Sequence, residues 1–210
     1  MLRQNSNDEV LQCAHQRISA LREKGVGMEM VGKIAAPAGT YENEFFGVRF
    51  TLPEGFSFYD EGQMAELNKS IGEAQTDEDI VKALDSGQAF FDMAAAAAGG
   101  AVVNAVIAHA GAPDVQALDA AAYLELAKAG LEAQLASAGA ELKDAQVGTY
   151  KNEKTGDEFA YMDVQFEAQG ALMFEELACL KAGDYFMTIS ATAQDKAELE
   201  KVLENFALVK

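Results

Sequence analysis

The chain has 210 residues, half of them hydrophobic, which is enough for one folded domain with a substantial core. Its formal net charge is −18, and the excess lies after residue 40, where thirty acidic side chains face eleven basic ones. Phosphate backbones and anionic lipid repel such a chain, so we expect neither nucleic acid nor an anionic membrane surface as its partner.

No apolar run approaches the roughly 18 residues that a membrane span needs. The first ten residues, MLRQNSNDEV, also lack the apolar core of a secretory signal, so we expect no membrane span and no signal peptide in this chain. Two widely spaced cysteines, Cys13 and Cys179, predict no disulfide framework. The sequence leaves their redox state open and favours free thiols, with Cys179 acting as a small apolar side chain.

The N-terminal part is poorly patterned. Residues 1–24 form a weak helical stripe, and the small residues at 35–39 are typical of a linker. We therefore predict a helical tail and linker over residues 1–39, and a single domain over residues 40–210.

That domain opens with YENEFFGVRFTLPEGFSF at residues 41–58. Large apolar side chains alternate with polar ones up to Leu52, which predicts a strand with one buried face. Pro53 ends the strand, because proline has no N–H to donate to a neighbour. The sequence from Leu52 to Gly55 then predicts a type I turn, followed by a second short strand.

Two helices are expected next, the first beginning at Asp60 with Gln63 in a capping box, and the second beginning at Thr76 and ending at 86–87. Residues 88–98 are ambiguous, since their alanines favour a helix. We interpret them as a strand, because Gly99-Gly100 suits a hairpin and residues 101–108 are rich in valine and isoleucine. Asp119 is expected to cap a long helix that reaches about Ala138.

Four further strands are predicted at 140–151, 158–168, 171–181 and 184–191, and a last amphipathic helix at 194–206. Together these elements predict the α+β class, with one antiparallel β-sheet flanked by helices. GTYENEFFG at 39–47 and GTYKNEKTG at 148–156 agree at six of nine positions. This echo is either an internal repeat or, as we favour, shared turn chemistry.

The opening FFGVRFTLPEGF, the strand GDYFMTISA and the helix DKAELEKVLENF resemble the PsbP-like fold. The resemblance covers about residues 41–210 and includes uncharacterised bacterial exported proteins and lipoproteins. It implies an α/β/α sandwich, a binding or assembly role in place of catalysis, and a location outside the cytoplasm. The chain differs from the exported members because no signal peptide is predicted in it, so the localisation stays unknown.

Candidate functional residues are few. On strand alternation, Glu176 shares a face with Leu172, Phe174, Ala178 and Leu180, so it is the best candidate for a functional carboxylate if that face is buried. His109 follows a predicted strand and Asp114 lies in the same loop, which would allow a base and its orienting acid to meet. No spacing indicates a metal site, a phosphate-binding loop or any cofactor.

These observations favour a non-catalytic binding or assembly module of a bacterial envelope or exported protein, with a protein or envelope component as its partner. They identify no small-molecule ligand. Two alternatives remain open: a small hydrolase that uses His109 and Asp114 or Glu176, and an acidic domain that responds to divalent cations.

Overall fold

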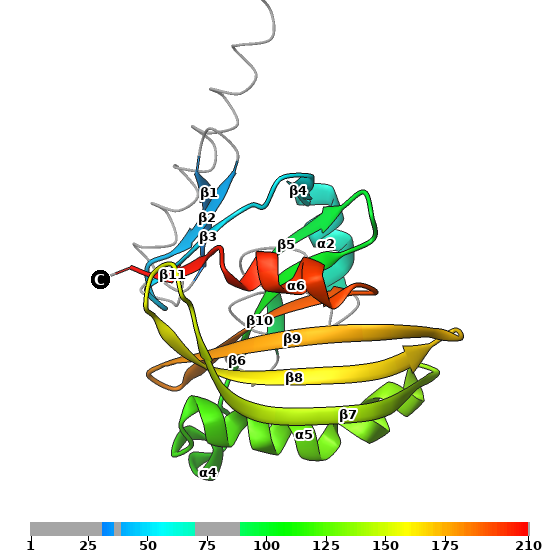
Figure 1. The fold of residues 1–210 in the computed structure, drawn as a ribbon. Coiled ribbons are helices and arrows are strands. Elements are labelled where there is room, and N and C mark those ends of the chain that lie inside the picture. Colours follow the sequence, from blue (N-terminus) through cyan, green and yellow to red (C-terminus); the bar gives the residue numbers. More distant parts are fainter. Residues whose placement is uncertain (1–30, 36–38, 70–88, 210) are drawn as a thin grey trace, which may run out of the picture.

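The computed structural model describes residues 31–35, 39–69 and 89–209, and the predicted helices at 1–24 and 76–86 lie outside this part of the chain. The described residues form two antiparallel sheets and four helices (Figure 1). The four-stranded sheet has the order β1 (Lys33–Ala35), β2 (Thr40–Asn43), β3 (Val48–Thr51) and β11 (Phe206–Leu208).

The seven-stranded sheet is the larger one, and its strands have the order β4 (Phe56–Phe58), β5 (Ala89–Ala97), β6 (Val102–His109), β10 (Tyr185–Ala193), β9 (Ala171–Ala182), β8 (Glu158–Ala168) and β7 (Ala140–Lys151). The helices are α2 (Glu61–Lys69), α4 (Pro113–Gln116), α5 (Ala120–Ser137) and α6 (Lys196–Leu203). The α+β class and the flanking helices predicted from the sequence are confirmed. The prediction of a single sheet is wrong, because β1, β2, β3 and β11 form a sheet of their own.

The helices cover opposite faces of the larger sheet. Helix α5 packs on β7, β8 and β9 from one side, whereas α6 packs on β9 and β10 from the other (Figure 1). The Asp119 side chain accepts a hydrogen bond from the N–H of Ala122 at the start of α5, as the sequence predicted. Asp60 and Gln63 likewise exchange hydrogen bonds of 2.9 Å in a capping box before α2.

The main core lies between the two sheets and α6. Val48 and Phe50 of β3 point into it with no exposed surface, while Arg49 and Thr51 point outward, which confirms the predicted alternation. The Phe50 ring stacks on Phe206 of β11 with ring centroids 4.2 Å apart. A second, smaller core lies between α5 and the sheet. The larger sheet is therefore apolar on both faces, as a sheet covered by helices requires.

Two local predictions for residues 41–58 are wrong. The strand is interrupted after Asn43 by a turn that ends at Gly47, whose φ of 61° suits glycine, so the segment forms the β2–β3 hairpin. The proline turn lies one residue later than expected: its closing hydrogen bond joins Phe56 N–H to Pro53 O. Gly55, at the third turn position, has a φ of 88°. A positive φ at that position is the mark of a type II turn, which type I does not allow.

Lys33–Ala35, which the sequence placed in the tail, pairs with β2 as strand β1. The last helix is also shorter than predicted, because α6 ends at Leu203 and the chain continues into β11. β11 pairs with β3, so these two ends of the described chain meet in the small sheet.

Candidate functional site

One face of the strands β7, β8 and β9 stays partly open to solvent beside α6. Cross-strand pairs place its side chains, because Gln146 lies opposite Asp163, and Asp163 lies opposite Glu176. We call this surface the tyrosine face, and its members are Gln146, Tyr150, Tyr161, Asp163, Leu172 and Glu176. Leu172 is 47% exposed and Gln146 is also exposed, while both tyrosines are partly buried.

Helix α6 borders this face through an ion pair. The Lys196 ammonium group contacts Oδ2 of Asp163, and the two side chains are 39% and 26% exposed. Lys196 stands in the first turn of α6, directly after the capping residue Asp195, whose carboxylate accepts from the N–H of Ala197. The cap at Asp195 fixes where α6 begins, and this places Lys196 within reach of Asp163 on β8.

Glu176 is the most heavily buried acid of the tyrosine face, with 3% of its surface exposed. Burial raises the pKa of its carboxyl group, and the hydrogen bond from Tyr161 and the charge of Lys196 oppose this rise, whereas Asp163 and Glu200 add to it. Oε2 of Glu176 and Oδ1 of Asp163 are both buried without a hydrogen-bond partner among the described residues. Two neighbouring carboxylates thus each present one free oxygen.

The two tyrosines lie beside these acids, with ring centroids 5.8 Å apart. Burial raises the pKa of the Tyr161 hydroxyl far above its usual range, and Glu176 adds to the rise through its charge and its hydrogen bond. The pKa of Tyr150 is raised by burial and then by the charges of surrounding glutamates, among them Glu204, Glu176 and Glu200. The face therefore has a negative potential as well as an aromatic surface.

Glu175, the neighbour of Glu176, points to the opposite side of the sheet, as alternation requires. Burial raises the pKa of its carboxyl group, and a hydrogen bond to Ser190 opposes the rise. Glu175 is a second acid of the same strand, partly buried, and it takes no part in the tyrosine face.

His109 and Asp114 are not brought together. The His109 ring lies against Tyr185 with centroids 4.9 Å apart, and its Nδ1 atom is buried without a partner in the described part of the chain. Asp114 lies on α4, where it is exposed. Within residues 31–35, 39–69 and 89–209, the two side chains share no hydrogen bond or ion pair.

Cys179 is free and 1% exposed, and burial raises the pKa of its thiol to about 12. A thiol in this environment stays protonated near neutral pH and is a poor nucleophile. Across the described ranges, no three His, Cys, Asp or Glu side chains come together as ligands for a metal ion, and no helix is long and apolar enough to cross a membrane.

At the bulge in β5, Asp92 forms a hydrogen-bonded cluster that the sequence did not predict. The register of β5 against β6 shifts between Phe91 and Met93, and the Asp92 side chain accepts hydrogen bonds from Gly32 N–H (2.9 Å), the Tyr41 hydroxyl and the Asn43 amide (3.0 Å). Asp92 is the one charged residue of the segment AFFDMAAAA, and a lone charge in an apolar strand could have indicated a buried polar contact. These partners are two residues of β2 and the residue just before β1, so the cluster fastens the small sheet to the large one.

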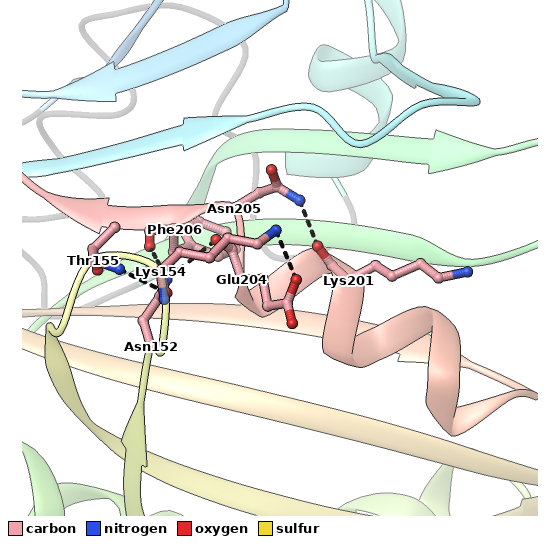
Figure 2. A network of polar contacts seen from close by, with 7 residues as sticks. All are labelled: Asn152, Lys154, Thr155, Lys201, Glu204, Asn205 and Phe206. Carbon is pink, nitrogen blue, oxygen red and sulfur yellow. Dashed lines mark hydrogen bonds and ion pairs between the residues drawn. The ribbon is translucent and has the colours of Figure 1, made fainter.

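Asn152 forms a second buried network that the sequence analysis missed. Figure 2 shows its amide between the β7–β8 turn and the end of α6, where Nδ2 donates to the carbonyls of Glu204 (3.2 Å) and Phe206 (2.7 Å). Its Oδ1 accepts from the backbone N–H groups of Lys154 and Thr155. Asn152 is fully buried, so this network has a structural role.

No protein-family model matches the sequence, and no curated protein matches it. Among solved structures, the chain is similar to the cyanobacterial PsbP (CyanoP) of Synechocystis sp. PCC 6803. That similarity has 13% identity and a TM-score of 0.47, and it covers 88% of this chain and 95% of the other. A protein of Bacteroides thetaiotaomicron VPI-5482 is similar at 12% identity and a TM-score of 0.34, over 87% of this chain and 50% of that one. The first of these proteins belongs to the family that the sequence resembles. The likeness concerns the course of the chain and does not extend to function.

Proposed function

We propose that the protein is a non-catalytic binding or assembly module that receives a protein or an envelope component on its tyrosine face. The observation that carries this proposal is the partial exposure of Tyr150, Tyr161 and Leu172 on one sheet face that α6 borders. Tyrosine combines a large apolar surface with a polar tip, and it is enriched at interfaces for that reason.

The alternative of a hydrolase needs a base held by an acid within hydrogen-bond distance. His109 and Asp114 have no such contact, and the buried thiol of Cys179 is a poor nucleophile. These placements favour a binding role over a catalytic one.

A site-specific crosslinking experiment tests the proposal. A photoreactive phenylalanine analogue at Gln146 would report on the tyrosine face, and the same residue at the exposed Glu132 of α5 would report on the opposite side. We expect a discrete adduct in extracts of the native organism from position 146 and none from position 132. The adduct should disappear when Tyr150 and Tyr161 are both replaced by alanine.

Equal adducts from both positions would contradict the proposal, because they would indicate non-specific contact. An adduct at position 146 that survives the double alanine replacement would place the partner elsewhere. Turnover of ester or phosphoester substrates by the wild-type protein, lost in His109→Ala, would favour the hydrolase.

A further inference from the structure

We propose that the tyrosine face holds a receiving site for one lysine or arginine side chain of a partner protein, formed by Glu176 and Asp163. This inference rests on the proposed function, and it names the chemistry of the group that the face would bind.

The charges around the site do not balance. Lys196 brings one positive charge, whereas Asp163, Glu176 and Glu200 act on the same region with negative charge. The ammonium group of Lys196 is already committed to Oδ2 of Asp163. A second cationic group would therefore lower the electrostatic free energy of the site.

The geometry supplies the acceptors for that group. Oε2 of Glu176 and Oδ1 of Asp163 have no hydrogen-bond partner among the described residues, and they belong to residues directly opposite each other on β9 and β8. Directly opposite side chains in an antiparallel pair start about 5 Å apart at their Cβ atoms. An ammonium or guanidinium group has several donors, so one such group can bond to both oxygens.

Access to the oxygens depends on how deep they lie. Glu176 is 3% exposed, and it lies on an interior strand of the sheet beside the partly exposed side chains of Asp163 and Lys196. One of these, Lys196, is 39% exposed and stands on a short surface helix. Rotation of such a side chain takes nanoseconds or less at an exposed position, so an incoming cation can reach Glu176 without unfolding any element.

The surroundings favour an organic cation over a metal ion. The two tyrosine rings stand beside the acids, and aromatic faces attract ammonium and guanidinium groups. In the described part of the chain, no third carboxylate, histidine or cysteine joins Glu176 and Asp163 to form a ligand set. Leu172 is exposed on the same face of β9, and a protein surface around the bound cation could cover it, whereas a free amine could not, so we assign the cation to a protein.

A peptide titration tests the site. The probe is an acetylated, amidated pentapeptide with a central lysine flanked by alanine and leucine, and its control carries norleucine in place of lysine. We expect the lysine peptide to shift the NMR signals of Tyr150 and Tyr161 at millimolar concentration, while the norleucine peptide leaves them unchanged. Nα-acetyl-lysine methylamide is added as a free-amine arm and should bind more weakly than the peptide.

The matched variants are Glu176→Gln and Glu175→Gln, which remove adjacent acids on opposite faces of β9. We expect Glu176→Gln to weaken lysine-peptide binding at least tenfold, because a buried partner charge is lost, and Glu175→Gln to leave binding within twofold. Thermal unfolding of both variants checks that each one is folded. Wild-type binding should also weaken on acidification, since protonated Glu176 carries no charge.

Equal weakening by both variants would overturn the inference, because it would show diffuse attraction to an acidic protein. Equal binding of the lysine and norleucine peptides would overturn it without any variant, and so would equal binding of the peptide and the free amine. The crosslink from position 146 distinguishes failure of this inference from failure of the proposed function. If the crosslink persists in Glu176→Gln, the inference fails and the proposed function stands; if it is absent in the wild type, the proposed function fails.

Discussion

The carboxylates of Asp92 and Glu176 differ in how their oxygens are satisfied. Asp92 accepts hydrogen bonds from Gly32, Tyr41 and Asn43, so its burial is compensated by donors on the small sheet. Glu176 leaves one oxygen without a partner among the described residues. Burial raises the pKa of both groups, and Glu176 belongs to the tyrosine face, which is partly open to solvent. Asp92 therefore has a structural role, and for Glu176 we propose a binding role.

Replacing Tyr41 by phenylalanine should destabilise the protein. The Tyr41 hydroxyl donates to Asp92 at a position where Tyr41 is 1% exposed, so its loss removes a donor from a buried carboxylate. We expect the free energy of unfolding to fall by about 1–3 kcal/mol, measured by urea denaturation. The control is Tyr123→Phe, because the Tyr123 ring stacks on Phe186 and its hydroxyl makes no hydrogen bond to the described residues. A similar loss in both variants would contradict the role given to Asp92.

Position 32, next to Asp92, has room for glycine and for no residue with a Cβ atom. A Cβ atom at this position would lie 2.2 Å from Cε2 of Tyr41, which is far inside van der Waals contact. The close approach lets the Gly32 N–H reach the Asp92 carboxylate. The sequence could not predict this contact, because Gly32 and Asp92 are brought together only by the packing of the two sheets.

At the scale of elements, the β7–β8 turn and the β2–β3 turn share one design. In each, an asparagine lies at the end of the first strand or directly after it, and its Oδ1 accepts a hydrogen bond from at least one backbone N–H of the turn. A glycine with positive φ follows four residues later. These residues are Asn43 with Gly47 and Asn152 with Gly156. The echo of GTYENEFFG and GTYKNEKTG is therefore explained by shared turn chemistry, which was the favoured interpretation of the sequence.

Replacing Asn152 by alanine should weaken the connection between the β7–β8 turn and β11, which would then depend on the hydrogen bond from Leu208 N–H to Asp157. The change strands the buried carbonyl of Phe206 and turn N–H groups without partners, so we expect a loss of about 3 kcal/mol in the free energy of unfolding. Asn205→Ala is the control in Figure 2, since its amide donates to the carbonyl of Lys201 at an exposed position and water can replace it. Equal effects of the two substitutions in urea denaturation would argue against the network.

Local patterns predicted most elements of the fold. The alternation in β8 and β9, the caps Asp60 and Asp119, and the glycine turn after β5 all act over a few residues, and the structure confirms them. The division into two sheets was not predictable in this way, because β11 has only three residues and pairs with the distant β3. The alternation of β9 predicted the face on which Glu176 lies. It could not predict which oxygens of Glu176 and Asp163 lack a partner, because Lys196, which contacts Asp163, belongs to α6.

At the scale of the whole molecule, the raised pKa values of its buried acids link stability to pH. Asp92, Glu175 and Glu176 each have a pKa above the ordinary value of about 4, and burial is the first cause for all three. Between the ordinary pKa and the raised one, the folded state binds more protons than the unfolded state. Stability therefore falls as pH rises through this window, and the contribution of these acids is greatest at and below the ordinary value. Repulsion among the excess acids acts in the same direction.

We accordingly expect the thermal midpoint to rise when the pH is lowered from 8 to about 5. The double variant Glu175→Gln/Glu176→Gln should show a smaller rise, because two of the three linked groups no longer titrate. Differential scanning calorimetry at constant ionic strength measures both slopes. A midpoint that falls steadily from pH 8 to 5 would contradict the burial of these acids, and an identical slope in the variant would assign the effect to general repulsion.

The pairing of β3 with β11 has a consequence for folding kinetics. The two strands come from opposite ends of the described chain, and the Phe50–Phe206 stack forms only when they meet. Such a distant encounter carries a large loop-closure entropy, which slows folding unless the intervening segment has already collapsed. The seven-stranded sheet, built mainly from neighbouring hairpins, can assemble earlier and present a ready surface. We therefore expect the small sheet to close last during folding and to open first under stress.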